Sequence, residues 1–273
     1  MSNMKKTAVY IILIIYLLVN VYPLVWMVQN SVKTDQQIAL QPFALPTELH
    51  FENYVSAWSQ VDLGTGFWNS AWISVAATLI CVFLGAVASF FLSRFEFAGR
   101  QPIYTYLIFG MLIPVHATLV PMFILESKLG MMNTPFSLLF PYVAFNLPIT
   151  VFILVSFMRG FHREIEESAV IDGCGIRQLF LSVILPMTRP ALATVVILNF
   201  IHNWNEFSFA LVLVNDSDLR TLPLAVASLA GQFTTSVSTQ MSGLTMALVP
   251  TLIIYFFLQD QLVKGMTAGA VKG

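Results

Sequence analysis

Six long stretches of this chain are apolar, and they carry a single charged residue between them, Glu206. A transmembrane helix needs about 20 predominantly apolar residues, and each stretch is close to that length. The 273 residues are 57% hydrophobic and only 10% charged, which is too little charge to cover a water-soluble fold of this size. The sequence therefore predicts an all-α membrane protein, with residues 1–273 forming one domain of six transmembrane helices. The expected spans are Ala8–Val28, Trp68–Leu92, Ile103–Leu125, Ser137–Met158, Ala191–Val214 and Ser242–Leu258.

The first stretch follows Lys5 and Lys6, as a cleaved secretory signal would. Its apolar core is longer than the roughly 7–15 residues of a signal, and no small-residue cleavage pattern follows, so we expect a retained helix. The piece Leu222–Ala230 is too short to span a membrane. We expect it either to pack against the outer ends of the other helices or to form a buried loop. The expected spans contain six prolines, which break or kink helices, and these favour a bundle of moving helices only weakly. The six are Pro23, Pro114, Pro121, Pro141, Pro148 and Pro250.

The basic residues between the spans indicate the orientation, because Lys and Arg in short loops stay in the cytoplasm. A cytoplasmic N-terminus puts ten of the 13 basic residues inside and three outside, so we expect six spans and both termini in the cytoplasm. Two outer loops, Ser31–Gly66 and residues 215–241, are long enough to meet a soluble partner, or they are solvated connectors. The three outer basic residues are Lys33, Lys128 and Arg220.

Several functions are excluded by what the chain lacks. The net charge of −1 gives no basic excess for nucleic acid. The two cysteines, Cys81 and Cys174, are too few for a zinc site or a disulfide framework. No Gly-Lys dipeptide occurs, so there is no phosphate-binding loop for ATP. We expect no cofactor, no metal site and no enzymatic activity of its own, and the energy for any transport has to come from a partner.

The most informative segment is the cytoplasmic loop at residues 159–190. Phe161, Ile165 and Ala169 recur every four residues and predict one apolar helix stripe, with Glu164 and Glu167 on another face. Two glycines then break the helix. A second amphipathic helix follows, with apolar residues at Ile176, Leu179, Phe180, Val183 and Ile184, and we expect it to stop before Pro186. A surface hairpin that merely connects two spans fits the same pattern.

The loop contains Glu167-Ser168-Ala169, then Asp172-Gly173, then Ile184-Leu185-Pro186, and Pro190. This order resembles the cytoplasmic signature loop of permease subunits in binding-protein-dependent ABC importers, which reads Glu-Ala-Ala, three residues, Gly, nine residues, Ile, any residue, Leu-Pro. Ser168 departs from the first alanine, and either Val183 or Ile184 stands for the isoleucine. The resemblance implies a type I ABC importer permease fold, and a coupling helix that seats in a cleft of an ATPase subunit. Glu167 would face a basic group of the ATPase and Gly173 would allow a tight turn. The positions implied at this contact are Glu164, Glu167, Ser168, Ala169, Asp172 and Gly173.

Two further segments are similar to carbohydrate importers of this type. The C-terminal segment 264–273 resembles the tail of the maltose-type second permease subunit, which reaches between two ATPase protomers; a frayed end is the simpler alternative. In the fifth span, Trp204-Asn205-Glu206-Phe207 resembles a recurrent carbohydrate-permease sequence. The resemblance implies a second permease subunit, two ATPase subunits and an extracytoplasmic sugar-binding protein as partners, in a bacterial or archaeal plasma membrane. The tail residues implied at the ATPase are Ala268, Gly269, Ala270, Val271, Lys272 and Gly273.

The polar residues of the fifth span have a physical meaning of their own. A carboxylate inside a membrane helix has to be paired or face water, so Glu206 should point into the bundle or into a pathway. Trp204 and Asn205 could offer a sugar a stacking face and hydrogen bonds. A structural role fits equally, for example a bridge between Glu206 and His202, four residues apart. We expect His116 in the third span to be a satisfied interior residue.

The leading hypothesis is a permease subunit of an ATP-driven importer for a sugar or oligosaccharide. A permease of the same type for a polyol or glycerol phosphate is the second hypothesis. Neutral sugar is favoured over a phosphorylated substrate, because no Lys or Arg lies within the six stretches. The third hypothesis is a secondary transporter that works alone, which would show inverted repeats and would not need the signature loop.

Overall fold

The computed structural model describes residues 3–231 and 236–270, and every regular element within those ranges is a helix. The chain divides into two compact units. The first comprises Met1–Gly64 and Leu222–Pro250, and the second comprises Thr65–Thr221 and Thr251–Gly273. The all-α prediction is therefore confirmed over the described residues.

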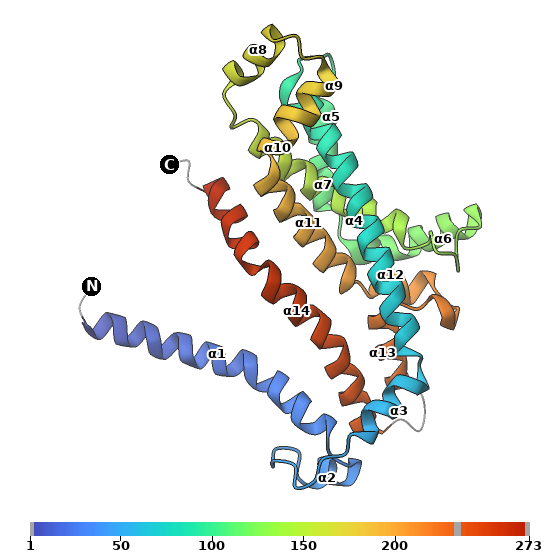
Figure 1. Cartoon of the computed structure of the whole chain (residues 1–273). Helices are drawn as coiled ribbons and strands as arrows, with labels where there is room; N and C mark the ends of the chain where they lie inside the picture. The colour runs from blue at the N-terminus through green and yellow to red at the C-terminus, as the bar shows by residue number, and fades with distance from the viewer. Residues whose placement is uncertain (1–2, 232–235, 271–273) are drawn as a thin grey trace. The chain divides into compact units, whose positions relative to one another are not determined.

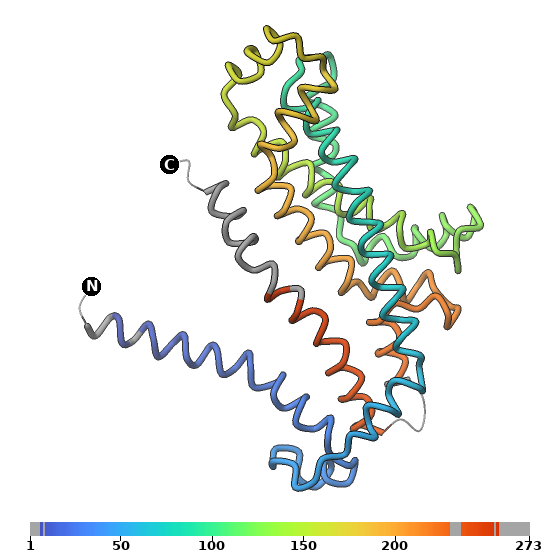
Figure 2. Tube along the Cα trace, viewed as in Figure 1, coloured from blue at the N-terminus to red at the C-terminus, as the bar shows by residue number. Residues whose placement is uncertain are grey.

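The first unit is built on the N-terminal helix, which is one uninterrupted helix in Figure 2. Its side chains are exposed along nearly the whole length, as expected of an apolar helix whose natural surroundings are lipid or another membrane helix. The helices of this unit are α1 (Asn3–Ser31), α2 (Asp35–Leu40), α3 (Glu52–Gln60), α13 (Leu222–Gly231) and the first part of α14 (Val237–Ala270) (Figure 1).

Hydrogen bonds join the end of α1 to the beginning of α14. The Ser242 hydroxyl donates to the Ser31 carbonyl over 2.8 Å, and the Ser238 amide donates to Asp35 Oδ1 over 2.8 Å. Asn53 on α3 donates to the carbonyls of Ser31 and Lys33, each over 2.9 Å. The C-terminal end of α1 and the N-terminal end of α14 therefore lie together.

The short apolar piece after Thr221 is helix α13, so the buried-loop alternative is wrong. Leu224, Ala225 and Leu229 on this helix are buried. Gly243 of α14 lies so close to Leu229 that a Cβ atom would come within 2.6 Å of its Cδ1. The piece thus packs against the start of α14, as the packing alternative predicts.

The second unit contains most of α4, the helices from α5 to α12 and the last part of α14. Its α-helices are α4 (Leu63–Arg94), α5 (Arg100–Phe109), α6 (Leu119–Leu129), α7 (Leu139–Met158), α8 (Arg163–Ile171), α9 (Ile176–Gln178), α10 (Leu185–Met187), α11 (Arg189–Trp204) and α12 (Ser208–Leu213). Short elements complete it: the 3₁₀ turns η1 (Gly110–Leu112), η2 (Val115–Thr118) and η4 (Ser217–Leu219), and the π-helix η3 (Leu179–Ile184).

Helices α4, α7 and α11 lie side by side and supply the core of this unit (Figure 1). The backbone of α4 at Gly85 lies close to Thr150 of α7. A Cβ atom built on Gly85 would be only 2.4 Å from the Thr150 methyl carbon. Small residues at such crossings let membrane helices approach closely. A second cluster of Phe90, Met158, Leu179 and Ile184 joins the ends of α4 and α7 to η3.

The third expected span is not one continuous helix, and this corrects the prediction of Ile103–Leu125. The chain bends by 97° between Leu112 and Val115. Pro114 has no amide hydrogen, and the residue before it, Ile113, is extended with ψ of 116°. Proline disfavours the helical conformation at the preceding residue, so two helices replace one.

The fifth expected span, Ala191–Val214, also needs correction. Helix α11 ends at Trp204, Asn205 and Glu206 follow it, and α12 begins at Ser208. At its other end, the segment Ile176–Met187 meets α11 at a bend of 76°.

Three helices of the described residues are long and apolar enough to cross a membrane: Val9–Ser31, Leu63–Arg94 and Leu139–Met158. Each bent pair adds one crossing if it counts as one span. Val237–Ile253 is a shorter apolar helix in the place expected for the last span.

Candidate functional site

Helix α8 gathers the residues that the signature loop predicts. Glu164, Glu167 and Ser168 are exposed on it, Ala169 is half-buried, and Asp172 is its exposed C-terminal cap. Two acidic residues in the first turn, Glu164 and Glu166, interact favourably with the helix dipole. The structure thus brings all the predicted α8 residues together at one end of the second unit.

A tight turn ends α8 at Gly173. The Cys174 amide donates to the Ala169 carbonyl and the Gly173 amide to the Val170 carbonyl, each over 3.0 Å. Together these bonds form a Schellman motif, which requires a left-handed residue after the cap. Gly173 supplies it with φ of +88°. Nothing lies within 4 Å of a Cβ atom built there, so the backbone angle rather than space restricts this position.

The charged residue that α8 turns inward is Glu166, which the sequence reasoning missed. Its Oε1 lies 2.9 Å from Nε of Arg94, the last residue of α4, and the two side chains are 14% and 6% exposed. The pKa of Glu166 is raised by burial and lowered again by the charge of Arg94, with burial the larger effect. The signal for this pairing was the lone arginine that ends an apolar span.

The predicted apolar stripe of α8 is only partly right. Phe161 and Ala169 pack against the cluster of Phe90, Met158, Leu179 and Ile184, as expected for the inner face. Ile165 is 39% exposed. Phe161 lies before the helix, because His162 is extended with ψ of 134°, so it does not share the period of Ile165 and Ala169.

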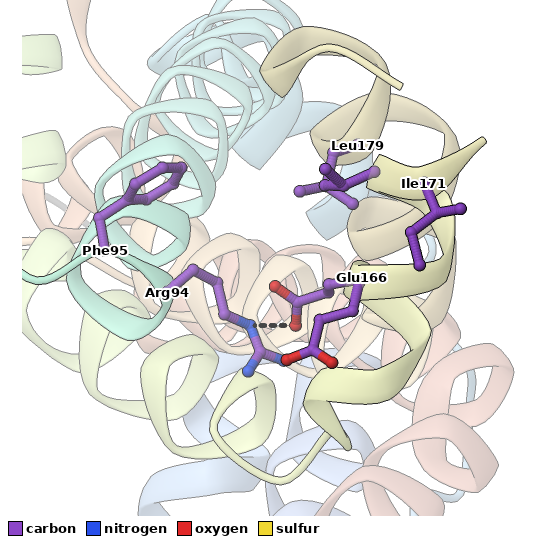
Figure 3. Close-up of a pocket in the computed structure, with 7 residues that line it drawn as sticks. Arg94, Phe95, Glu166, Ile171 and Leu179 are labelled. Carbon is purple, nitrogen blue, oxygen red and sulfur yellow. Dashed lines mark ion pairs between the residues drawn. The ribbon is translucent and has the colours of Figure 1, made fainter. Parts of the chain in front are cut away.

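A cavity of about 380 Å³ lies between α8, η3 and the end of α4. Figure 3 shows Arg94 paired with Glu166 on one side of it, with Phe95, Ile171 and Leu179 around the rest. Glu167 and Val170 complete its lining. An acidic group beside apolar walls suits a side chain that has a basic end and an apolar stem.

The second helix of the loop continues past the expected stop before Pro186. The Leu185 amide donates to the Phe180 carbonyl five residues earlier, which is the π-helical spacing. Such a widened turn is one of the ways in which a helix accommodates a local irregularity like proline. The segment ends at Met187, and α11 begins at Arg189.

The polar cluster of the fifth span lies at the end of α11 rather than inside a helix. Oε1 of Glu206 accepts the Phe209 amide over 2.7 Å, and Oε2 accepts the Tyr142 hydroxyl over 2.9 Å and the Ala210 amide over 3.3 Å. The carboxylate therefore caps α12 and ties it to α7.

The neighbours of Glu206 differ in exposure. Trp204 is 4% exposed and packs on Phe67 and Phe200, so its ring has no open face for a sugar in this chain. Asn205 is exposed. His202 is exposed too. The Glu206 carboxylate contacts Phe209, Ala210 and Tyr142 instead of His202, so the bridge between His202 and Glu206 is not formed. His116 is exposed, which corrects its expected interior placement.

A buried network of amides and hydroxyls joins α4, α7 and α11. Asn146 donates to Asn203 over 2.7 Å, and Asn203 donates to Thr78 over 3.2 Å. One helical turn away, Asn199 donates to Thr150 over 3.0 Å. These residues were not predicted, although small polar residues within apolar spans are the signal that would have found them.

No group of three or more His, Cys, Asp or Glu side chains arranged to hold a metal occurs within residues 3–231 and 236–270. Of the predicted tail residues, Ala268, Gly269 and Ala270 end α14. Val271, Lys272 and Gly273 lie outside the described residues.

Residues 81–268 match the family of binding-protein-dependent transport system inner membrane components. The chain belongs to this family. The permease is 34% identical to a diacetylchitobiose uptake permease of Streptomyces coelicolor, NgcG, over 96% of this chain and 87% of the relative. It is 30% identical to the lactose transport permease LacG of Rhizobium radiobacter, over 96% and 95% of the two chains.

The permease shares its fold with a chain of a bacterial ABC transporter that imports the acidic polysaccharide alginate. The TM-score is 0.81 at 22% identity, over 94% of this chain and 96% of the other. The permease therefore has the type I ABC importer permease fold, and it is an inner membrane component of a transport system. The family membership that the resemblance implied is confirmed.

Proposed function

We propose that this permease passes a neutral sugar or oligosaccharide from an extracytoplasmic binding protein into the cell, driven by ATP hydrolysis in separate subunits. The observation that carries the proposal is helix α8, whose exposed Glu167 and Schellman turn at Gly173 stand where the family signature has its coupling helix. The names of the relatives NgcG and LacG support a carbohydrate substrate.

The proposal includes six spans, and contacts within the second unit support four of them. Arg94 at the end of α4 contacts Met158 at the end of α7, and Cys81 lies 3.5 Å from Thr150 earlier on both helices. Helices α4 and α7 therefore run parallel, so the segment between them has to cross back. This favours a broken span for the α5–α6 pair over a re-entrant loop.

Contacts of α7 with α11 support the next crossing. Asn146 of α7 is hydrogen-bonded to Asn203 of α11, and Thr150 of α7 to Asn199 of α11. The residue that comes later in α7 therefore pairs with the one that comes earlier in α11. The two helices are antiparallel. Helix α11 then returns the chain to the external side, where residues 215–241 would meet a binding protein.

Contacts in the first unit support our proposal that both termini are cytoplasmic. The end of α1 and the start of α14 are joined by the hydrogen bond from Ser242 to Ser31, which supports placing these two helix ends on the same side of the membrane. Ten basic residues support the cytoplasm as that side.

The partners in this proposal are a second permease subunit, two ATPase subunits and the binding protein. Glu164, Glu167, Ser168 and Asp172 face the ATPase from α8, and the segment 264–273 reaches between the ATPase protomers. Asn205 is exposed and contributes to the sugar pathway, while the packing of Trp204 and the three hydrogen bonds of Glu206 favour structural roles for those two residues.

The decisive experiment measures ATP hydrolysis by the complete complex in liposomes, with the binding protein and one solute at a time. Diacetylchitobiose, lactose, sorbitol and glycerol 3-phosphate form the panel. We expect stimulation by a neutral oligosaccharide. Stimulation by glycerol 3-phosphate alone would favour the anionic alternative, and solute counterflow by this chain without ATPase subunits would show a secondary transporter.

A further inference from the structure

One arginine side chain joins three elements at the cytoplasmic end of the second unit. Nε of Arg94 pairs with Glu166 on α8 at 2.9 Å, and its Nη2 donates to the carbonyl of Met158, the last residue of α7, over 2.6 Å. The guanidinium also lies 5.7 Å from the centre of the Phe161 ring, at the start of the loop. Arg94 itself ends α4, so it connects α4, α7 and α8. Figure 3 marks its pair with Glu166.

Consecutive glutamates of α8 differ in exposure. Successive residues of an α-helix are rotated by about 100°, so neighbours in sequence face different directions. The Glu166 side chain is 14% exposed and held by Arg94, whereas Glu167 is exposed. Helix α8 therefore fixes one carboxylate to the membrane helices and presents the next to the side that we assign to the ATPase.

The other contacts of α8 are less able to transmit a displacement. The ion pair of Arg163 with Glu96 is longer, at 3.7 Å, and its side chains are 67% and 78% exposed. Exposed pairs of this kind contribute little. The apolar contacts of Phe161 and Ala169 are not directional, so they permit small shifts. The buried pair of Arg94 and Glu166 resists separation, because parting its two charges would leave both unpaired in a buried place.

We propose that Arg94 and Glu166 are positioning residues that carry the movement of α8 to the ends of α4 and α7 during ATP-driven import. The inference rests on the proposed function, because it requires α8 to be the ATPase contact. Neither residue touches the solute. Arg94 holds the two long helices at one point, and Glu166 attaches the coupling helix to that point.

The test compares Glu166→Ala with the matched control Glu96→Ala, which breaks the exposed ion pair of the same region. Each complex is reconstituted with its ATPase subunits and binding protein, and lactose or diacetylchitobiose, whichever stimulates the parent complex more, is the probe. The amount of sugar moved per ATP hydrolysed is measured. Removing one partner of a buried ion pair leaves the other charge unpaired, so we expect this ratio to fall about tenfold or more in Glu166→Ala.

Glu96→Ala should keep the parental ratio, and Glu166→Gln, which retains an acceptor for Arg94, should recover part of the loss. The ATPase subunits should co-purify with all three variants in parental amounts. A parental ratio of sugar to ATP in Glu166→Ala would overturn the inference.

A buried arginine without its partner can destabilise the chain, so a double variant separates assembly from coupling. Arg94→Met/Glu166→Leu removes both charges at similar volume, which typically preserves stability. An assembled but uncoupled double variant supports the inference. If the double variant has the parental ratio of sugar to ATP, the pair serves folding alone and the inference is overturned. The same holds if neither Glu166→Ala nor the double variant assembles. If Glu167→Lys also transports normally, the proposed function fails too; if Glu167→Lys is inactive, only the inference fails.

Discussion

Replacing Glu206 by alanine should destabilise the permease, because this carboxylate accepts three hydrogen bonds at the junction of α11 and α12. Two come from the Phe209 and Ala210 amides at the start of α12, and one comes from the hydroxyl of Tyr142 on α7. Tyr142 is only 2% exposed, so water does not replace the lost acceptor readily.

The expected size of the effect follows from these partners. Loss of a helix cap contributes about 1 kcal/mol. An interhelical hydrogen bond in a membrane protein contributes about 0.6–1.7 kcal/mol, which covers the Tyr142 contact. Glu206→Ala should therefore lower the free energy of unfolding by about 2 kcal/mol, close to a 30-fold change in the unfolding equilibrium.

Glu206→Gln is the matched control, since its amide can accept the Phe209 amide with one end and donate to the Tyr142 oxygen with the other. We expect it to lose less than half as much as the alanine variant. A double-mutant cycle of Tyr142→Phe with Glu206→Ala should give a coupling of about 1 kcal/mol.

The assay is unfolding of the purified chain by sodium dodecyl sulfate in mixed micelles, followed by circular dichroism. Parental stability in Glu206→Ala would refute the capping role. If both variants assemble normally but shift the concentration dependence of sugar uptake, Glu206 lines the pathway instead.

Three other outcomes are expected. Glu167→Lys and Gly173→Asp should abolish sugar uptake while the amount of permease in the membrane stays parental. Gly173→Asn should keep part of the uptake, because asparagine tolerates a positive φ better than most residues. Uptake at the parental rate in Glu167→Lys and Gly173→Asp would refute the ATPase contact. Removal of Thr267–Gly273 should lower uptake or its coupling to ATP hydrolysis without lowering membrane levels, and full activity would indicate a frayed end. Gly85→Ala should destabilise the chain by about 1–3 kcal/mol through its clash with the Thr150 methyl group, and Thr150→Ser should restore stability by removing that methyl; thermal unfolding that shows no rescue would contradict the packing.

Sequence patterns predicted the long helices well, because apolar length is the only requirement for crossing a membrane. Helices α1, α4 and α7 each contain the expected stretch apart from a few residues at the ends. Pro114 was named as a helix breaker, but the size of its bend was not predicted, since a proline in a membrane helix produces anything from a slight kink to a full break, depending on its neighbours.

The fifth span shows a different limit. Residues up to Val214 are apolar enough to continue a helix, yet α11 ends at Trp204. The Glu206 carboxylate accepts hydrogen bonds from the backbone amides of the next helix. This local interaction competes with continuation of α11, and a hydropathy profile does not detect it.

On α8, the sequence indicated the correct helix but not which glutamate faces inward. Glu164, Glu166 and Glu167 are equally charged, and only the phase of the helix distinguishes them. That phase was counted from Phe161, which lies before the helix begins at Arg163. The Arg94–Glu166 pair needs the fold, because 71 intervening residues separate its members.

The amide and hydroxyl network of α4, α7 and α11 sets the axial register of these helices. Apolar side chains can exchange one contact for another when helices slide, but Asn146, Asn199 and Asn203 have their hydrogen-bond partners at fixed heights on a neighbouring helix. A slide by one turn, about 5.4 Å, would break these bonds together without water to replace them. We therefore expect the three helices to tilt as a single rigid block, with the bend of 76° before α11 acting as a hinge at its border.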